Sequence, residues 1–331
     1  MRVALLGATG LVGREMMRTL EARGFPASEV VPLASSRSRG SRVPFRGGEL
    51  EVLEVNADSF VGVDIAFFSA GADASRRWAP EAKKKGAVVI DNSSAWRMDP
   101  DVPLVVPEVN PGAMAGHKGL IANPNCATIQ AVMALKPLHD AAGLVRFSVV
   151  TFQSVSGTGK EAIEELAGNS GAFLSGEEGA ASVYPHDIAF DVLPQIGGFD
   201  EDGVSEEEWK MIRESRKIMG IPGLEVRCTA VRVPVFRGHS EAVTAIFERV
   251  LTPGEARELL SSAPGVRLLD EPSKGLYPTA RGSQGREPVF VGRVRRDTIS
   301  EKGLMMWVVS DNLLKGAALN AVQIAEVLAF R

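Results

Sequence analysis

The sequence predicts an α/β protein: an N-terminal Rossmann-like dinucleotide-binding domain followed by an α+β domain with a mixed sheet. In roughly the first third of the chain, short apolar strands alternate with helical segments, which is typical of a parallel, doubly wound sheet. After about residue 124, long strands follow one another, which favours a mixed or antiparallel sheet. We therefore divide the 331 residues into 1–124, completed by a C-terminal helix at 312–331, and 125–311.

The first element is a strand at residues 2–6, followed by a glycine loop and a helix at about 14–23. The loop reads Gly7-Ala-Thr-Gly10-Leu-Val-Gly13, a variant of the glycine-rich dinucleotide fingerprint. Its glycines would let the backbone approach a pyrophosphate at the start of the helix. A tight turn without a ligand is the alternative interpretation.

The second strand, residues 30–34, ends in Ser35-Ser-Arg-Ser-Arg-Gly40. A site for NAD usually places an acidic residue here, which holds the ribose 2′-hydroxyl, whereas arginine suits a 2′-phosphate. Arg37 and Arg39 therefore favour NADP, and the alternative is a basic surface loop.

Further strands are expected at 63–69, 87–92 and 104–106, with a helix at 74–85. The segment Asp91-Asn-Ser-Ser-Ala-Trp-Arg97 follows the carboxyl end of one of these strands, where open α/β sheets bind ligands. Arg97 either holds a phosphate there or is a surface arginine.

Cys126 lies in Asn123-Pro-Asn-Cys126, directly before an apolar helical pattern that runs to about residue 141. The free N–H groups at a helix N-terminus favour a thiolate, which is the nucleophilic form. The alternative is a cysteine that serves as a small buried hydrophobe.

In the second domain, strands are expected at 145–153, 224–236, 241–250, 287–296 and 303–310. A helix begins at the capping box Thr252-Pro-Gly-Glu255, and an amphipathic helix at 313–330 ends the chain. The stretch Ser156-Gly-Thr-Gly-Lys160 lacks features of a Walker A loop, but it can form an anion-binding glycine turn.

Alternation along the strand at 224–236 places Arg232 opposite Val231, Val233 and Val235. Such an arginine could clamp a carboxylate. His239 follows at a predicted turn, either as an acid or base near neutral pH or as a solvated side chain. The segment Glu207-Glu-Trp-Lys210 starts a helix, and a solvated face is the favoured interpretation there.

Composition narrows the function classes. With 37 basic and 41 acidic residues, the chain has no excess of positive charge that would attract nucleic acid. We find neither a membrane-spanning apolar segment nor a signal peptide, and two distant cysteines argue against a disulfide framework. The four histidines have no metal-ligand spacing, so we expect no metal and a cytoplasmic protein.

These motifs together resemble the aspartate-β-semialdehyde dehydrogenase family over essentially the full chain. The resemblance rests on the glycine loop, the segments ending at Arg97 and Cys126, and the motifs Gln153-Ser-Val-Ser-Gly157, Glu207-Glu-Trp-Lys210, Arg232 with His239, and Asp311-Asn-Leu-Leu-Lys-Gly316. It implies an NADP-dependent homodimer that reductively dephosphorylates L-aspartyl-4-phosphate to the semialdehyde, in lysine (through diaminopimelate), threonine and methionine biosynthesis. The cofactor loop resembles the Gram-positive branch, with a helical insertion at about 168–194 that usually supports the dimer.

The resemblance also implies roles for individual residues. Cys126 would carry the acyl group as a thioester, Gln153 would orient it, and His239 would be the acid/base. Substrate and inorganic phosphate would be bound by Arg97, Asn125, Glu207, Lys210 and Arg232. The cofactor would contact Gly7, Thr9, Gly10, Leu11, Val12, Ser36, Arg37, Ser156, Gly157 and Asn312.

Two other functions stay open. An N-acetyl-γ-glutamyl-phosphate reductase has a similar cysteine, histidine and nucleotide-binding domain. The Asn-Pro-Asn-Cys126 and Asp311 to Gly316 segments nevertheless favour the aspartyl enzyme. A non-catalytic paralogue that binds NADP is the second alternative, and the joint presence of Cys126, Gln153 and His239 argues against it.

Overall fold

The computed structural model describes residues 1–330 and divides them into two compact units. Unit 1 comprises residues 1–125 and the segment from 316 onward, and unit 2 comprises residues 126–315. The chain therefore leaves the first unit directly before Cys126 and returns to it for its last helix.

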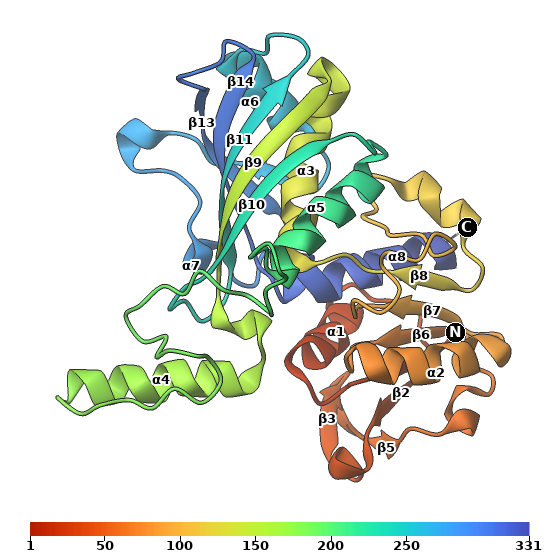
Figure 1. Ribbon diagram of the computed structural model, residues 1–331. Coiled ribbons are helices and arrows are strands. Elements are labelled where there is room, and N and C mark those ends of the chain that lie inside the picture. The colour runs from red at the N-terminus through yellow and green to blue at the C-terminus, as the bar shows by residue number, and fades with distance from the viewer. Residues whose placement is uncertain (331) are drawn as a thin grey trace. The chain divides into compact units, whose positions relative to one another are not determined.

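Unit 1 is built on a six-stranded sheet whose order is β5-β2-β1-β6-β7-β8 and whose neighbouring strands are all parallel (Figure 1). Its strands are β1 (Arg2–Leu6), β2 (Glu29–Ala34), β5 (Leu53–Glu54), β6 (Ile65–Phe68), β7 (Val88–Asp91) and β8 (Leu120–Ala122). A separate hairpin consists of β3 (Arg42–Phe45) and β4 (Gly48–Glu51). The predicted doubly wound, parallel architecture is confirmed.

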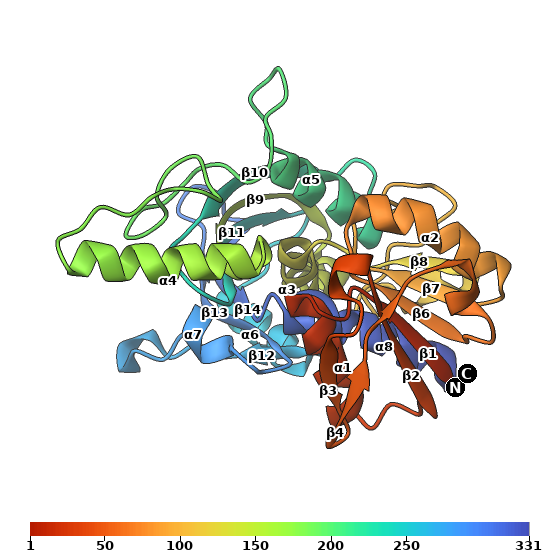
Figure 2. The same ribbon diagram turned by 90° about the horizontal axis from the view of Figure 1, so that it is seen from below.

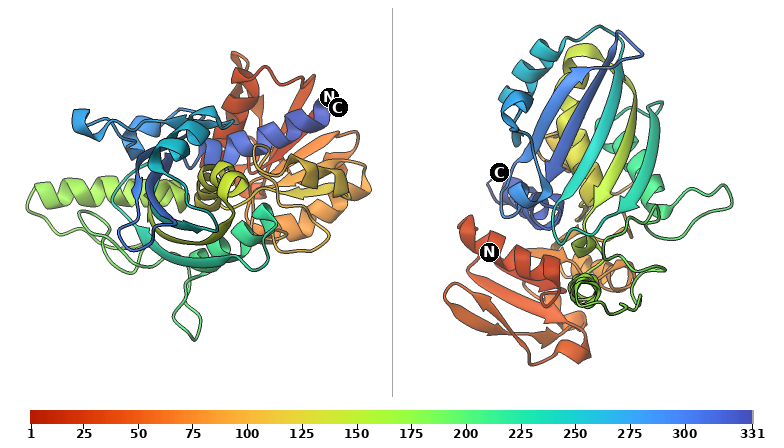
Figure 3. Two further views of the ribbon diagram at one scale, coloured as in Figure 1. Left: turned by 90° about the horizontal axis from the view of Figure 1, so that it is seen from above. Right: turned by 90° about the vertical axis from the view of Figure 1, so that its left-hand side faces the viewer.

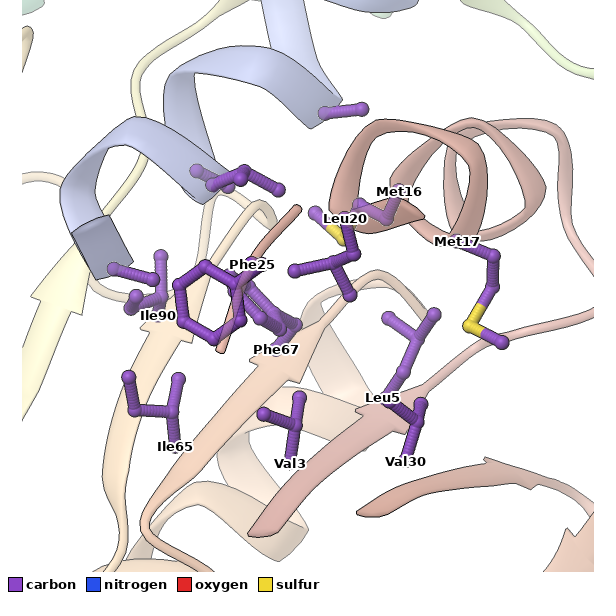
Figure 4. Close-up of a cluster of buried hydrophobic side chains, with 14 of the residues drawn as sticks. Val3, Leu5, Met16, Met17, Leu20, Phe25, Val30, Ile65, Phe67 and Ile90 are labelled. Atoms are coloured by element: carbon purple, nitrogen blue, oxygen red, sulfur yellow. The ribbon is translucent and has the colours of Figure 1, made fainter. Parts of the chain in front are cut away.

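Helices cover both faces of this sheet. The helices of the unit are α1 (Leu11–Ala22), α2 (Ala72–Lys84) and α8 (Leu319–Ala329), with short 3-10 turns η1 (Ser36–Ser38), η2 (Ala57–Phe60) and η3 (Pro111–Gly116). Alternate residues of the strands point to opposite faces. Val3 and Phe67 therefore join the core under α1 and α8, shown in Figure 4, whereas Phe68 stacks on Phe60 of η2, which α2 contacts.

Unit 2 contains a six-stranded mixed sheet in the order β10-β9-β11-β14-β13-β12, as predicted for the second domain. The strands are β9 (Leu144–Gln153), β10 (Glu225–Arg232), β11 (His239–Phe247), β12 (Val266–Leu268), β13 (Val289–Arg296) and β14 (Gly303–Ser310). The outer pairs β10–β9 and β12–β13 are parallel, and the inner pairs are antiparallel.

One helix lies at the centre of this unit. The helices are α3 (Cys126–Ala142), α4 (Lys160–Leu174), α5 (Glu206–Met219), α6 (Pro253–Ser262) and α7 (Ala280–Ser283), with 3-10 turns η4 (Val155–Gly157) and η5 (Pro272–Lys274). The α3 helix packs on β9, β11, β14 and β13, and α5 and α6 flank it. Figure 3 shows the curved sheet wrapping around α3, and Figure 2 shows α4 projecting from the rest of unit 2.

Two predicted strands differ from the structure. The segment 104–106 makes only an isolated bridge from Leu104 to Ala122, because the Asn110 side chain takes the Val106 N–H and the Leu104 carbonyl. The strand β10 stops at Arg232 instead of residue 236, because Pro234 has no N–H to donate to a ladder.

Two helical predictions need correction, and a third is confirmed. The predicted insertion helix begins earlier, since α4 spans Lys160–Leu174 and no helix follows until α5. The last helix starts with a π-helical turn, η6 (Leu314–Ala318), and α8 buries apolar residues around most of its surface, so it is not strongly amphipathic. The capping box at Thr252 is confirmed, with Pro253 at the first helical position. None of the helices within residues 1–330 has the length and apolar character needed to cross a membrane.

Candidate active site

The α3 helix begins at Cys126, which confirms the predicted helix start. The Cys126 side chain is half-buried, and Asn125 directly before it is buried. A cysteine in the first turn lies among N–H groups that have no partner within the helix, and these groups and the helix dipole favour negative charge on sulfur. This position therefore suits a nucleophile.

Three neighbouring strands bring predicted site residues to one edge of the unit 2 sheet. Gln153 ends β9, and its register partner on the parallel strand β10 is Arg232, which ends that strand. His239 begins β11, which runs antiparallel to β9 and therefore starts at the edge where β9 ends. The tertiary fold thus gathers residues that are 86 positions apart, from 153 to 239, at one edge.

Gln153 connects this edge to the start of α5. Its Nε2 donates to Glu207 Oε1 at 3.2 Å and to Thr151 Oγ1 at 3.3 Å, and Lys210 Nζ lies 3.0 Å from Glu207 Oε2. Glu207 is buried, so the solvated helix face favoured from the sequence is wrong for this residue. The capping box of Ser205 and Glu208 fixes the beginning of α5 and thereby the position of Glu207.

Arg232 is buried, and its Nη1 donates to the Ser154 carbonyl oxygen at 2.7 Å. Its Nε is buried and has no hydrogen-bond partner within residues 1–330, which leaves donor capacity for an anionic group. The predicted alternation is wrong in part, because Val233 and Val235 lie beyond the end of β10. The buried side of β10 is the one that carries Arg232 and Ala230.

His239 is fully buried, which corrects the predicted position at an exposed turn. Burial, together with the Arg232 charge, lowers the pKa of His239 to about 3, so the imidazole is neutral near neutral pH. Nδ1 accepts a hydrogen bond from the Ser154 backbone N–H at 3.1 Å, which assigns the proton to Nε2. That Nε2 is buried and has no partner in the described chain.

Gly157 lies directly against these two side chains. A Cβ atom added to Gly157 would lie 3.1 Å from Arg232 Nη1 and 3.5 Å from His239 Nε2. The neighbouring residue Ser156 is fixed by Asn312, whose side chain also accepts from Ser154 Oγ and from the Gly238 N–H at 2.8 Å. The Asn312 amide therefore holds the η4 turn against the segment that precedes His239.

The glycine loop of unit 1 forms a close backbone approach at the carboxyl end of β1. Gly7 has φ +92°, and a Cβ there would lie 2.3 Å from the Ser69 carbonyl oxygen. A Cβ on Gly13 would lie 2.1 Å from the Gly7 oxygen. The α1 helix begins at Leu11 instead of residue 14, so Gly10, Leu11 and Val12 form its N-terminus, which fits a pyrophosphate.

The turn after β2 presents the side chains that would distinguish the cofactors. Ser36 and Arg37 lie in η1 and are exposed, and Arg37 makes no ion pair among the described residues. Thr9 Oγ1 lies 3.5 Å from Ser38 Oγ, which brings this turn beside the glycine loop. Both loops follow strands of one parallel sheet, at the edge where such sheets bind nucleotides.

Arg97 is buried and is not the surface arginine of one interpretation. Its Nε donates to the Asn123 carbonyl at 3.0 Å, and its Nη2 donates to the Asn92 carbonyl at 2.8 Å. Arg97 therefore ties the turn after β7 to the segment that leads into Cys126.

Sequence reasoning missed several groups that organise the site. The Ser154 backbone contacts both Arg232 and His239, and Tyr184 places its ring centroid 5.9 Å from Arg232 Cζ. The side-chain nitrogen and oxygen of Asn92 are buried without partners within residues 1–330. Contacts made through the backbone leave no signal in residue type, so the role of Ser154 could not be predicted from the sequence.

Family models match almost the entire chain. Residues 2–117 match the semialdehyde dehydrogenase NAD binding domain, and residues 135–315 match the semialdehyde dehydrogenase dimerisation domain. The chain is 54% identical over 331 residues to an aspartate-semialdehyde dehydrogenase of Aquifex aeolicus, covering 99% of this chain and 97% of the relative. The chain belongs to the aspartate-semialdehyde dehydrogenase family.

Other members of the aspartate-semialdehyde dehydrogenase family agree with this assignment. The Bacillus subtilis enzyme is 50% identical over 336 residues, covering 99% of this chain and 97% of that one, which is consistent with the predicted Gram-positive-like branch. Aspartate semialdehyde dehydrogenase II of Vibrio cholerae, solved in complex with ASA, superposes with TM-score 0.96 at 45% identity and covers 99% and 98% of the two chains. The Candida albicans enzyme, solved with NADP, has TM-score 0.77 at 25% identity and covers the same shares.

The alternative functions are not favoured by these comparisons. The relatives match over nearly their full length and carry the aspartate-semialdehyde dehydrogenase name, so an N-acetyl-γ-glutamyl-phosphate reductase is not supported. The match over residues 2–117 also shows that the first unit is a domain that binds a nicotinamide dinucleotide cofactor.

Proposed function

We propose that this chain catalyses the reversible, NADPH-dependent reductive dephosphorylation of L-aspartyl-4-phosphate to L-aspartate-4-semialdehyde, in the biosynthesis of lysine, threonine and methionine. The observation that carries the proposal is the convergence of Gln153, Arg232 and His239 at one sheet edge, in a unit whose central helix begins at Cys126. Each of these groups has a task that an acyl-transfer reaction requires.

Cys126 would be the nucleophile. Its thiolate attacks the acyl carbonyl carbon, the carbon–sulfur bond forms, and the carbon–oxygen bond to the phosphate breaks with release of inorganic phosphate. The helix N-terminus favours the thiolate before attack. When bound, the nicotinamide cofactor supplies a hydride to the thioester carbonyl carbon.

His239 would act on the oxygen of the reacting carbonyl. In the neutral imidazole, the Nε2–H can donate a hydrogen bond to that oxygen as negative charge develops on it. Nδ1 already accepts from the Ser154 backbone N–H, so the neutral tautomer keeps its proton on Nε2. The Nε2–H of His239 would therefore stabilise the oxyanion by this hydrogen bond, both as it forms and as the hemithioacetal collapses to the aldehyde and the Cys126 thiolate.

The remaining residues would bind and orient the substrate. Arg232 would hold the substrate carboxylate with its unpartnered donor, and Glu207 with Gln153 would face its amine and carbonyl groups. Lys210 and Arg97, together with Asn125, would bind at the phosphate and acyl end. Fixing the register of such a small substrate places its carbonyl carbon at the sulfur, and a misplacement of about 1 Å can cost 10²-fold in rate.

We assign NADP as the preferred cofactor. Support comes from Ser36 and Arg37, which are exposed at the end of β2 where an NAD site has an acidic residue. The pyrophosphate would lie on Gly7, Thr9 and Gly10 to Val12, and the nicotinamide end would contact Ser156, Gly157 and Asn312. We also expect a cytoplasmic homodimer, supported by the dimerisation-domain match and by the exposed Phe173 and Leu174 on α4.

The proposal is tested by phosphate-dependent reduction of NADP with L-aspartate-4-semialdehyde, run beside N-acetylglutamate semialdehyde. We expect turnover with the former only, and Cys126→Ala should abolish it while NADP still binds, because the dinucleotide loops belong to the other unit. Turnover by the alanine variant within tenfold of wild type would exclude the thioester route. A preference for the N-acetylated substrate would exclude the proposed substrate.

A further inference from the structure

Glu241 is a buried carboxyl group for which the proposed chemistry has no use. It is the third residue of β11, fully buried, and it lies on the same strand face as His239, two residues away. Both carboxyl oxygens are buried and have no hydrogen-bond partner within residues 1–330, and no Lys or Arg of that range pairs with them. Burial raises the pKa of Glu241 well above its usual range, so the neutral acid is the form present near neutral pH.

The group beside Glu241 is the side chain of Gln130. Gln130 lies one helical turn after Cys126, so the two residues share a face of α3. Its Oε1 accepts from Ser310 Oγ at 2.5 Å, whereas its Nε2 is buried and unpartnered among the described residues. The α3 helix packs on β11, and the Gln130 amide is also the group that opposes the rise of the Glu241 pKa.

Ser310, which donates to Gln130, lies beside the strand that carries His239. It ends β14, and its register partner on β11 is His239 itself. The register partner of Glu241 on β9 is Thr151, which accepts from Gln153. The buried groups therefore form a layer directly beneath the candidate catalytic edge, between the first turns of α3 and the sheet.

Without a counter-charge, this layer can hold Glu241 only as a neutral acid. A protonated carboxyl offers a carbonyl oxygen to the free Gln130 Nε2–H and retains one O–H donor. A carboxylate at the same place would be a buried charge without a counter-charge, which is strongly unfavourable. Each of these two buried groups costs stability when unpaired, so we expect them to pair with one another.

We propose that Glu241 is a positioning residue: its carboxylic acid engages Gln130, and the set Glu241–Gln130–Ser310 fixes the first turn of α3, with Cys126, against the start of β11, with His239. The proposal rests on the proposed function only in naming Cys126 as the nucleophile. Its consequence is that the distance between thiol and imidazole depends on an uncharged hydrogen-bonding side chain at position 241.

The test compares Glu241→Gln with Glu241→Leu in the full-length chain. Glutamine is neutral and retains hydrogen bonding, so we expect kcat within about threefold of wild type. Leucine fills a similar volume but leaves Gln130 unsatisfied, so we expect kcat to fall at least tenfold, with the KM for NADP unchanged. Val243→Ala is the control, because Val243 is buried on the same face of β11 two residues further from His239 and its truncation only removes packing.

The second readout does not require the proposed substrate. The rate of Cys126 alkylation by iodoacetamide, followed by peptide mass spectrometry, should be close to wild type in Glu241→Gln and Val243→Ala, and should change at least threefold in Glu241→Leu. If the leucine variant fails to fold, Ser310→Ala interrupts the same set from its other end and should show the same change. Equal alkylation rates and kcat in all folded variants would refute the positioning role. Absence of turnover in the wild type, together with the predicted alkylation pattern, would refute only the proposed substrate.

Discussion

Replacing Gly157 with alanine would place a methyl group in the space where the reacting carbonyl oxygen is expected. The added Cβ would lie 3.1 Å from Arg232 Nη1 and 3.5 Å from His239 Nε2 and Cε1. An oxyanion must approach its donor to roughly 2.7–3.1 Å, so the methyl group and the oxygen would compete for the same space beside Nε2. The contact with Arg232 would also displace the guanidinium by a few tenths of an ångström.

We expect this substitution to lower kcat/KM for aspartate semialdehyde by about 100-fold, the usual cost of a displacement of about 1 Å at the reacting centre. That factor corresponds to about 2.7 kcal/mol of lost transition-state stabilisation. Folding should be little affected, because Gly157 does not have the positive φ at which alanine is strained. We expect the free energy of unfolding to change by less than about 1 kcal/mol.

The assay is phosphate-dependent NADP reduction, with urea unfolding of the same preparation. Gly254→Ala in α6 is the matched control, because the nearest atom to its added Cβ is Thr252 Oγ1 at 3.9 Å. That control should retain wild-type kcat/KM. A Gly157→Ala variant with kcat/KM within threefold of wild type and normal stability would refute the reasoning, since the space beside His239 Nε2 would then not be the reaction site.

Three further predictions concern binding and protonation. Arg232→Lys should lower kcat/KM by roughly tenfold to 100-fold with little change in the Kd for NADP, because lysine keeps the charge but loses the planar fork; an unchanged kcat/KM would mean that the carboxylate is bound elsewhere. Arg37→Asp should shift the ratio of kcat/KM values from NADP toward NAD, and equal values for both cofactors in the wild type would contradict the assignment. The folded state keeps His239 neutral with a pKa of about 3, so the unfolded chain binds the additional proton as pH falls below about 6.5. The contribution of His239 to the free energy of unfolding is complete above that pH and is smaller by about 2 kcal/mol at pH 5. In His239→Asn, the urea midpoint should therefore fall less between pH 7 and pH 5 than it does in the wild type.

The candidate site was predictable where its signals are local. The start of α3 at Cys126 follows from an Asn-Pro-Asn turn before an apolar helical pattern, and the glycine loop follows from its place between a strand and a helix. The end of β10 also had a local signal, because Pro234 cannot donate a ladder hydrogen bond. These features depend on residues within a few positions of one another, so the sequence by itself determined them.

Only the tertiary structure decided the environments of the reacting groups. The sequence predicts exposed positions for His239 and Glu207, yet both are buried. The α3 helix packs on β11, which begins at His239, and α5, which carries Glu207, packs on α3 and β10. Burial depends on elements distant in sequence, and it sets whether a group is charged: the same packing that keeps His239 neutral also leaves Glu241 without a partner. Residue types and their spacing therefore identified the chemistry, while packing between distant segments determined the protonation states with which that chemistry operates.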